Sequence, residues 1–209
     1  NSDTTDSKGN IDYVKTAAGL FGTYDTNESN TVVTIKDLTL TGSSVVCAPS
    51  SDTSGQDNYA YAGGLIGYVK KSLDSVVGGS LVLENVSVRL SGDVKTAPGT
   101  YYYAENFAYG GLVGYVDNNA ARLTVRNCAV EINGSVGDSK SNYSGGLVGR
   151  SANHPVTLEN SYASVGTITA ASRLSSGLPS PHAGGLMGYL SMNQCTVQNC
   201  YASFDSISA

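Results

Sequence analysis

Tyrosine is the residue type in this chain whose number and spacing could best support binding chemistry. The 209 residues include 14 Tyr and no Trp. A Tyr ring stacks on apolar surfaces such as the face of a sugar, and its hydroxyl forms hydrogen bonds. Aromatic side chains on loops over a rigid scaffold are typical of binding surfaces, although the same rings could simply cover an edge of the fold. The aromatic residues in or beside segments of variable length are Tyr59, Tyr61, Tyr101, Tyr102, Tyr103, Phe107, Tyr109 and Tyr143.

A second aromatic group recurs at one position of a glycine motif. Tyr68, Tyr115 and Tyr189 each follow the last Gly of the motif, and Arg150 takes the equivalent position in another copy. An outward stripe of Tyr and Arg could bind sugars or a neighbouring domain. The alternative is that these side chains only pack against those of adjacent copies. If the Gly-rich strand bends, the second apolar residue of the motif turns inside. The sequence leaves both orientations open.

Residue types that support catalysis are few and scattered. The two histidines, His154 and His182, each lie beside a Pro in a connecting segment, with no nucleophile placed near either. The polar runs at 25–29 and 117–119 lack the glycine and the terminal Glu of a calcium loop. We therefore predict no catalytic residue, no metal and no cofactor, and we predict that the chain is not an enzyme.

The four cysteines have two interpretations. Cys128, Cys195 and Cys200 occupy apolar positions of an internal repeat, which favours buried free thiols because Cys behaves as a small hydrophobe. A bridge between Cys195 and Cys200 is the alternative. Cys47 follows a predicted strand near a loop, which favours exposure.

The internal repeat has two linked elements in five copies. The first element, Gly-Gly-Leu-apolar-Gly, begins at residues 18, 63, 110, 145 and 184, with Ala18 in place of the first Gly. The second element alternates apolar and polar residues on both sides of one Asn or Asp. These central residues are Asp37, Asn85, Asn127, Asn160 and Asn199.

Alternation with a period of two predicts a half-buried strand on each side of the Asn. The apolar positions that flank the Asn are three residues apart, so the chain must bend there to keep both sets inside. Asn and Asp tolerate the left-handed conformation of such a bend. Stacked copies are expected to form a ladder in which the side-chain amides satisfy a buried turn.

Each repeat therefore contributes three short strands, and one repeat alone cannot bury its apolar face. Parallel stacking about 4.8 Å apart gives every strand a partner. The sequence predicts an all-β fold, a right-handed parallel β-helix (solenoid) of about five three-stranded coils, over residues 18–209. Residues 1–17 are expected to be a lead-in or cap. The variable segments that gather along one edge are 43–61, 91–108, 133–143 and 169–183.

The Gly-Leu-apolar-Gly cores, followed in four of the five copies by an Asn-Cys, Asn-Ser or Asn-Val step, resemble the GLUG-motif repeat. The first copy departs from this pattern with Asp37-Leu38. The resemblance covers about residues 18–206. It implies an extracellular β-helical or adhesive region, as in bacterial surface adhesin-like proteins or beside the catalytic domain of IgA-specific metallopeptidases. The zinc motif His-Glu-x-x-His of those peptidases is absent from the sequence.

Composition limits the partners and the location. Only 14% of residues are charged and the net charge is −5, so no basic stripe exists for nucleic acid or anionic lipid. The sequence contains no run of about 20 apolar residues, so we predict no membrane insertion. The chain lacks an initial Met and an apolar leader, which suggests a mature fragment of a longer protein. The expected location is extracellular or on a bacterial cell surface.

These observations predict a noncatalytic adhesion or interaction module that binds host glycan or surface protein through its edge loops. The alternative is a structural spacer in a larger secreted protein, where the open edge of the last coil contacts more repeats or another domain of the parent chain. A third hypothesis is a carbohydrate-active β-helix enzyme, which requires clustered acids and calcium.

Overall fold

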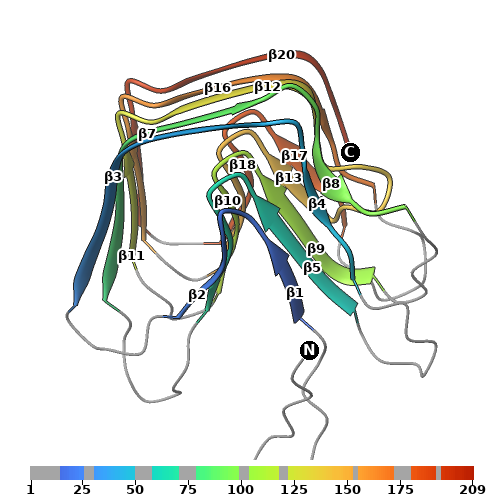
Figure 1. Ribbon diagram of the computed structural model, residues 1–209, viewed down its shortest axis with the longest axis horizontal. Helices are drawn as coiled ribbons and strands as arrows, with labels where there is room; N and C mark the ends of the chain where they lie inside the picture. Colours follow the sequence, from blue (N-terminus) through green and yellow to red (C-terminus); the bar gives the residue numbers. More distant parts are fainter. Residues whose placement is uncertain are drawn as a thin grey trace, which may run out of the picture.

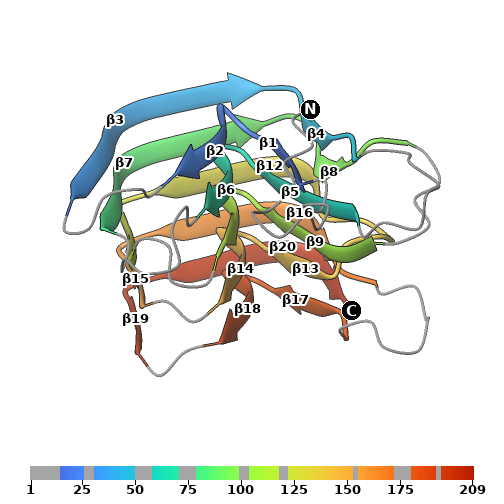
Figure 2. The same ribbon diagram turned by 90° about the horizontal axis from the view of Figure 1, so that it is seen from below.

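Parallel β-strands make up the architecture of this chain. The computed structural model describes residues 15–25, 31–49, 58–70, 79–98, 104–117, 122–152, 155–171, 180–191 and 194–209, and these ranges contain no helix. Figure 2 shows the coils stacked in chain order, from β3 at one end to β19 and β20 at the other. The predicted all-β fold, a parallel β-helix of five stacked coils, is confirmed.

The largest sheet forms an arch of ten strands (Figure 1). One side of the arch holds the strands before the Asn/Asp positions, and the roof holds the strands after them. β3 and β7 continue through the bend as single long strands. The arch contains β3 (Val32–Gly42), β4 (Val45–Cys47), β7 (Ser80–Leu90), β8 (Val94–Thr96), β11 (Arg122–Arg126), β12 (Ala129–Val136), β15 (Val156–Glu159), β16 (Tyr162–Thr169), β19 (Cys195–Gln198) and β20 (Tyr201–Ser208).

Two five-stranded sheets form an inverted V beneath the arch, which we call the wedge (Figure 1). Its two legs meet at the Gly-Gly-Leu turns. The leg before the turns contains β1 (Lys15–Ala18), β5 (Asn58–Gly63), β9 (Ala104–Gly110), β13 (Tyr143–Gly145) and β17 (His182–Gly184). The leg after the turns contains β2 (Phe21–Asp25), β6 (Ile66–Lys70), β10 (Val113–Val116), β14 (Val148–Ala152) and β18 (Met187–Ser191).

The sequence prediction missed the strand that each coil contributes to the leg before the turns. Each coil therefore has at least four strands rather than three. The segments before the Gly-Gly pairs differ in length, which suggested loops throughout. Their last residues nevertheless pair in register, with Tyr61 beside Ala108 and Tyr143 beside His182. The length variation is confined to residues further from the glycines.

The glycines of the motif allow close approach at the top of the wedge. A Cβ on Gly111 would lie 2.5 Å from Val130 Cγ1 of the arch, so this glycine lets the turn contact the roof. A Cβ on Gly114 would lie 2.5 Å from the carbonyl oxygen of Gly67 and 2.7 Å from that of Ala62. The third glycine of the motif therefore lets the two legs converge.

The main core fills the space between the arch and the wedge. The motif leucines Leu65, Leu112 and Leu147 are fully buried there. They pack against apolar columns of the arch such as Leu83 and Val125. The core runs unbroken from coil to coil, because each column has an in-register neighbour in the next coil.

The bend predicted at the Asn/Asp positions is confirmed. All five residues have positive φ, between 47° and 54°, which is the left-handed region that Asn and Asp tolerate better than most residues. They lie at an exposed outer corner of the arch, so the expectation of a buried turn is wrong. The corner is exposed because the apolar residues on both sides turn inward and leave the bend residue on the convex side.

Candidate functional site

Several of the tyrosines singled out by sequence converge inside the wedge, namely Tyr61, Tyr68, Tyr115, Tyr143 and Tyr189. The leg before the turns presents one column, and the leg after the turns presents another that faces it. The first column is Ala17, Tyr61, Ala108, Tyr143 and His182. The second column is Thr23, Tyr68, Tyr115, Arg150 and Tyr189.

Small and large residues alternate over the first four positions of the first column, and this alternation lets the two columns interdigitate. The ring centroid of Tyr61 lies 4.8 Å from that of Tyr68 and 4.9 Å from that of Tyr115. The next position in its column is Ala108, which leaves room for these rings. Tyr61, Tyr68 and Tyr115 are 1–5% exposed. This wedge cluster is a second apolar core, separate from the main one.

The sequence left open which way the side chains of the Tyr/Arg column point. In the structure they point into the space between the two legs of the wedge. Ile66 and Val113 face the main core, whereas Tyr68 and Tyr115 face the wedge cluster. The regular alternation of side chains between the two faces of the strand is interrupted at the third glycine. The two legs are too close there for any side chain. Packing between neighbouring copies, one of the two predicted alternatives, is therefore correct for these tyrosines.

Buried hydroxyls of the wedge cluster hydrogen-bond to one carboxylate. Tyr115 Oη donates to Asp117 Oδ1 at 3.0 Å, and Tyr68 Oη donates to Asp117 Oδ2. Burial raises the pKa of both phenols above its ordinary value, and the negative charge of Asp117 raises it further. The phenols stay protonated at neutral pH, so they act as hydrogen-bond donors and not as bases.

Arg150 places a cation among the rings at the C-terminal end of the wedge cluster. Its guanidinium carbon lies 4.6 Å from the ring centroid of Tyr143, 5.0 Å from that of Tyr115 and 5.7 Å from that of Tyr189. Arg150 Nη1 also donates to Asn106 Oδ1 at 2.5 Å. A guanidinium stacked on aromatic faces gains cation–π attraction, which is stronger in a partly dehydrated site.

The wedge cluster becomes accessible at the last coil. Arg150, His182 and Tyr189 are each half-buried. The His182 ring stacks on Tyr143 with centroids 5.6 Å apart and planes 3° apart, and it lies 5.0 Å from the Tyr189 ring. We call Tyr143, Arg150, His182 and Tyr189 the wedge mouth.

His182 is a site residue that sequence reasoning missed, since it was assigned to a connecting segment. A signal was present: His182 stands two residues before the first Gly of its motif, as Tyr61 and Tyr143 do. Asn106 carried no comparable signal, because its partner Arg150 comes from another coil. Asp117 was noted only as part of the polar run 117–119, whereas its partners are Tyr115 of the same coil and Tyr68 of the preceding coil.

The other aromatic residues predicted on loops divide between the main core and the edge. Phe107 and Tyr109 are fully buried in the main core, and Tyr109 Oη lies 2.8 Å from Thr96 Oγ1 in a hydrogen bond. Tyr59 is half-buried at the margin of the wedge cluster, 6.5 Å from the ring of Tyr61. Placement of Tyr59 and Phe107 in variable loops is wrong, because they lie on β5 and β9, and Tyr109, predicted to border a loop, also lies on β9. Tyr101, Tyr102 and Tyr103 lie outside the described residues.

The ladder at the arch corner is a structural feature. Asn85 Nδ2 donates to Asp37 Oδ1 at 2.8 Å, and Asn199 Nδ2 donates to Asn160 Oδ1 at 3.1 Å. Asn127 has the same conformation in the middle coil. These two bonds connect the first coil to the second and the fourth coil to the fifth, so the predicted ladder is confirmed at these two steps.

All four cysteines are free thiols. Cys128 is buried and Cys200 half-buried, in the same inward column, whereas Cys195 is exposed because it lies on the last coil. The predicted exposure of Cys47 is wrong: its side chain is 0% exposed, since β4 extends the arch and faces the core. Burial raises the pKa of the Cys47 thiol to about 12, which makes it a poor nucleophile.

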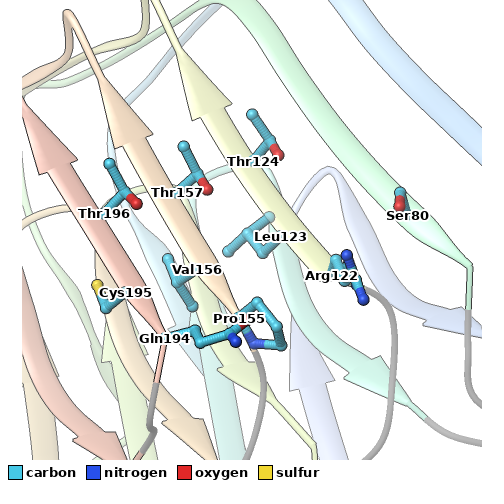
Figure 3. Close-up of a pocket in the computed structure, with 10 residues that line it drawn as sticks. All are labelled: Ser80, Arg122, Leu123, Thr124, Pro155, Val156, Thr157, Gln194, Cys195 and Thr196. Atoms are coloured by element: carbon cyan, nitrogen blue, oxygen red, sulfur yellow. The ribbon is translucent and has the colours of Figure 1, made fainter.

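A cavity of about 590 Å³ lies where four arch strands begin, as Figure 3 shows. A row of apolar side chains and a row of threonines line it from opposite faces of the strands, with Arg122 near one end. Its described lining contains no carboxylate and no histidine. Its described lining offers hydroxyl groups for hydrogen bonds, and partial burial raises the pKa of its one thiol, Cys195.

A shallower hollow of about 370 Å³ crosses the roof of the arch over three coils. Its carboxylates, Glu131 and Asp205, come from different coils. Glu131 is already engaged, with Arg89 Nε at 3.0 Å and the donating Tyr162 Oη at 2.5 Å. Within the described ranges, no group of three or more His, Cys, Asp or Glu side chains is arranged to hold a metal ion.

The comparisons with known proteins return nothing for this chain: no family model, no curated protein and no solved structure matches it. The resemblance to GLUG-motif repeats therefore stays a prediction from the sequence. Among the residues that the structure describes, none forms a helix with the length and apolar character of a membrane span.

Proposed function

We propose that this chain is a noncatalytic extracellular interaction module that binds a host glycan at the wedge mouth. The observation that carries the proposal is the half-buried group of Arg150, His182 and Tyr189, stacked over the buried ring of Tyr143. Among the other predicted aromatic residues that the structure describes, Tyr61, Tyr68, Phe107, Tyr109 and Tyr115 are buried in the fold.

The chemistry of the wedge mouth suits a sugar. A sugar ring has an apolar C–H face that stacks on an aromatic ring, and hydroxyls at its edge that accept hydrogen bonds. The exposed part of the Tyr189 ring supplies the stacking face, and Arg150 supplies N–H donors beside it. Because Arg150 is fixed by three rings and Asn106, little side-chain entropy is lost when a ligand binds.

A glycan array probed with the folded chain tests this proposal. Tyr189→Ala should weaken binding about tenfold or more, as expected for a central aromatic contact. Tyr201→Ala is the matched control, because Tyr201 is 59% exposed on the roof of the arch, stacked on Tyr162 and outside the wedge. Folded wild-type chain that binds no glycan, or equal losses in both variants, would contradict the proposal. Binding to proteins alone would move the assignment to a protein ligand.

A structural spacer is the second candidate, and the edges of the stack favour it. All four strands of the last coil are edge strands of their sheets. A spacer needs only a stiff stack whose ends attach to neighbouring parts of a longer protein. It predicts no ligand at the wedge mouth, so the same glycan array separates the two candidates.

A further inference from the structure

One column of the wedge contains a cation between aromatic rings. On the leg after the turns, Arg150 lies in register between Tyr115 of the third coil and Tyr189 of the fifth. Tyrosine fills this position in both adjoining coils, so packing of the column does not by itself require a positive charge. Arg150 has a coil on each side, and its partial exposure therefore does not come from either end of the stack.

The guanidinium of Arg150 has no anionic partner among the residues that the structure describes. Its Nη1 donates to the neutral amide oxygen of Asn106, and no described carboxylate forms an ion pair with it. Its Nε is buried and makes no hydrogen bond to the described residues. By contrast, Arg89 on the roof of the arch lies 3.0 Å from a carboxylate oxygen of Glu131. A cation partly removed from water without an anion is costly, and cation–π attraction offsets only part of that cost.

The wedge does contain a carboxylate, but the phenols of other coils use it. Asp117 accepts hydrogen bonds from Tyr115 of its own coil and from Tyr68 of the preceding coil. Asp117 stands two residues after Tyr115, and the register of the two strands gives Ala152 the same position after Arg150. The fourth coil thus has a cation where the third has a phenol, and a methyl group where the third has a carboxylate. The anion that would complete this pair is absent from the equivalent position of the strand.

We propose that the glycan bound at the wedge mouth is an acidic one and that Arg150 binds its carboxylate. This inference rests on the proposed function and names the chemical class of its ligand. A guanidinium has five N–H donors, and Arg150 makes one hydrogen bond to the described residues. The remaining donors suit a carboxylate, because charge-assisted hydrogen bonds of this kind are about twice as strong as neutral ones. The ring of Tyr189 beside it stacks on the apolar face of the same sugar.

Calorimetric titration of the full chain with matched oligosaccharides tests the inference. One pair is sialyllactose and lactose, and the other is trigalacturonic acid and its methyl ester, so the two pairs distinguish sialic acid from uronic acid as the source of the carboxylate. The acidic member of at least one pair should bind about tenfold or more tightly than its neutral counterpart. Added NaCl should weaken binding of the acidic member and leave that of the neutral one unchanged. These comparisons need no variant of the protein.

Two variants locate the carboxylate. Arg150→Gln retains N–H donors but loses the charge, so it should weaken binding of the acidic sugar about tenfold or more and that of the neutral sugar about twofold or less. Arg89→Gln is the matched control, because it removes the same charge from the roof of the arch and should leave both affinities unchanged.

The outcomes separate this inference from the proposed function. Equal binding of acidic and neutral sugars, an unchanged preference in folded Arg150→Gln, or equal losses in both variants would overturn the inference and leave glycan binding in place. Binding of sulfated lactose alone among the acidic sugars would overturn the assignment of a carboxylate. A folded wild-type chain that binds none of the sugars would contradict the proposed function, and the inference with it.

Discussion

Replacing Gly114 with Ala would place a methyl group where the two legs of the wedge converge. The added Cβ would lie 2.5 Å from Gly67 O, 2.7 Å from Ala62 O and 2.8 Å from Ala62 N. All three atoms belong to the backbone, so no side-chain rotation can relieve the contacts. Overpacking typically costs about 1–3 kcal/mol and occasionally more, and three backbone contacts favour about 3 kcal/mol. For a chain of this length, this loss lowers Tm by about 6–12 °C.

Thermal and urea unfolding, followed by far-UV circular dichroism and tyrosine fluorescence, measure this effect. Gly42→Ala is the matched control, because its nearest contact would be the Leu90 side chain at 3.3 Å. An exposed substitution of this kind changes the free energy of unfolding by about 0.5 kcal/mol or less. Equal stability of the two variants would refute the close approach of the legs, and with it the packing of the wedge cluster.

Three further predictions follow from the bend, the buried phenols and the thiols. Asn127→Ala should lower the free energy of unfolding by about 1–2 kcal/mol, because Ala disfavours a φ of 52°, while Asn127→Gly should cost less in the same urea titration. The raised pKa values of Tyr68 and Tyr115 mean that the folded state holds these protons more tightly, so stability is retained below about pH 10 and lost as pH rises above it. Urea unfolding between about pH 9 and pH 12 should show a loss near 1.4 kcal/mol per pH unit for each phenol that stays protonated, and a flat profile would contradict their burial. A thiol reagent should modify Cys195 in the native protein and Cys47 only after unfolding, as read by mass spectrometry.

Local patterns predicted the arch well. The slip in apolar period around Asn127 forces a bend, and the backbone there has the left-handed conformation that the slip implies. Alternation in segments such as 81–90 identified buried columns, and Leu81, Leu83, Val86 and Val88 are all 0–1% exposed. The bend and the buried columns each depend on a few neighbouring residues and on the equivalent residue of the next coil. The repeat supplies that equivalent residue, so both features can be read from the sequence.

The wedge could not be predicted in the same way, because its geometry depends on contacts between different coils. Tyr61 and Ala108 share a column, so no single strand shows the alternation of large and small residues. Gly114 is required by backbone atoms of the preceding coil, which the local sequence does not reveal. Cys47 was predicted exposed for a related reason: β4 extends the arch through pairing with β8 and not through its own pattern.

Tyrosine footprinting of the native chain, read by mass spectrometry, tests the central claim that the wedge encloses the candidate residues Tyr61, Tyr68, Tyr115 and Tyr143. Among the tyrosines that the structure describes, Tyr201, 59% exposed, should be modified fastest, and Tyr189 at the wedge mouth should follow. Tyr61 and Tyr115, 1% and 5% exposed, should be protected until the chain unfolds. Modification of Tyr61 and Tyr115 at the rate of Tyr201 would contradict the wedge and return these residues to an open binding surface.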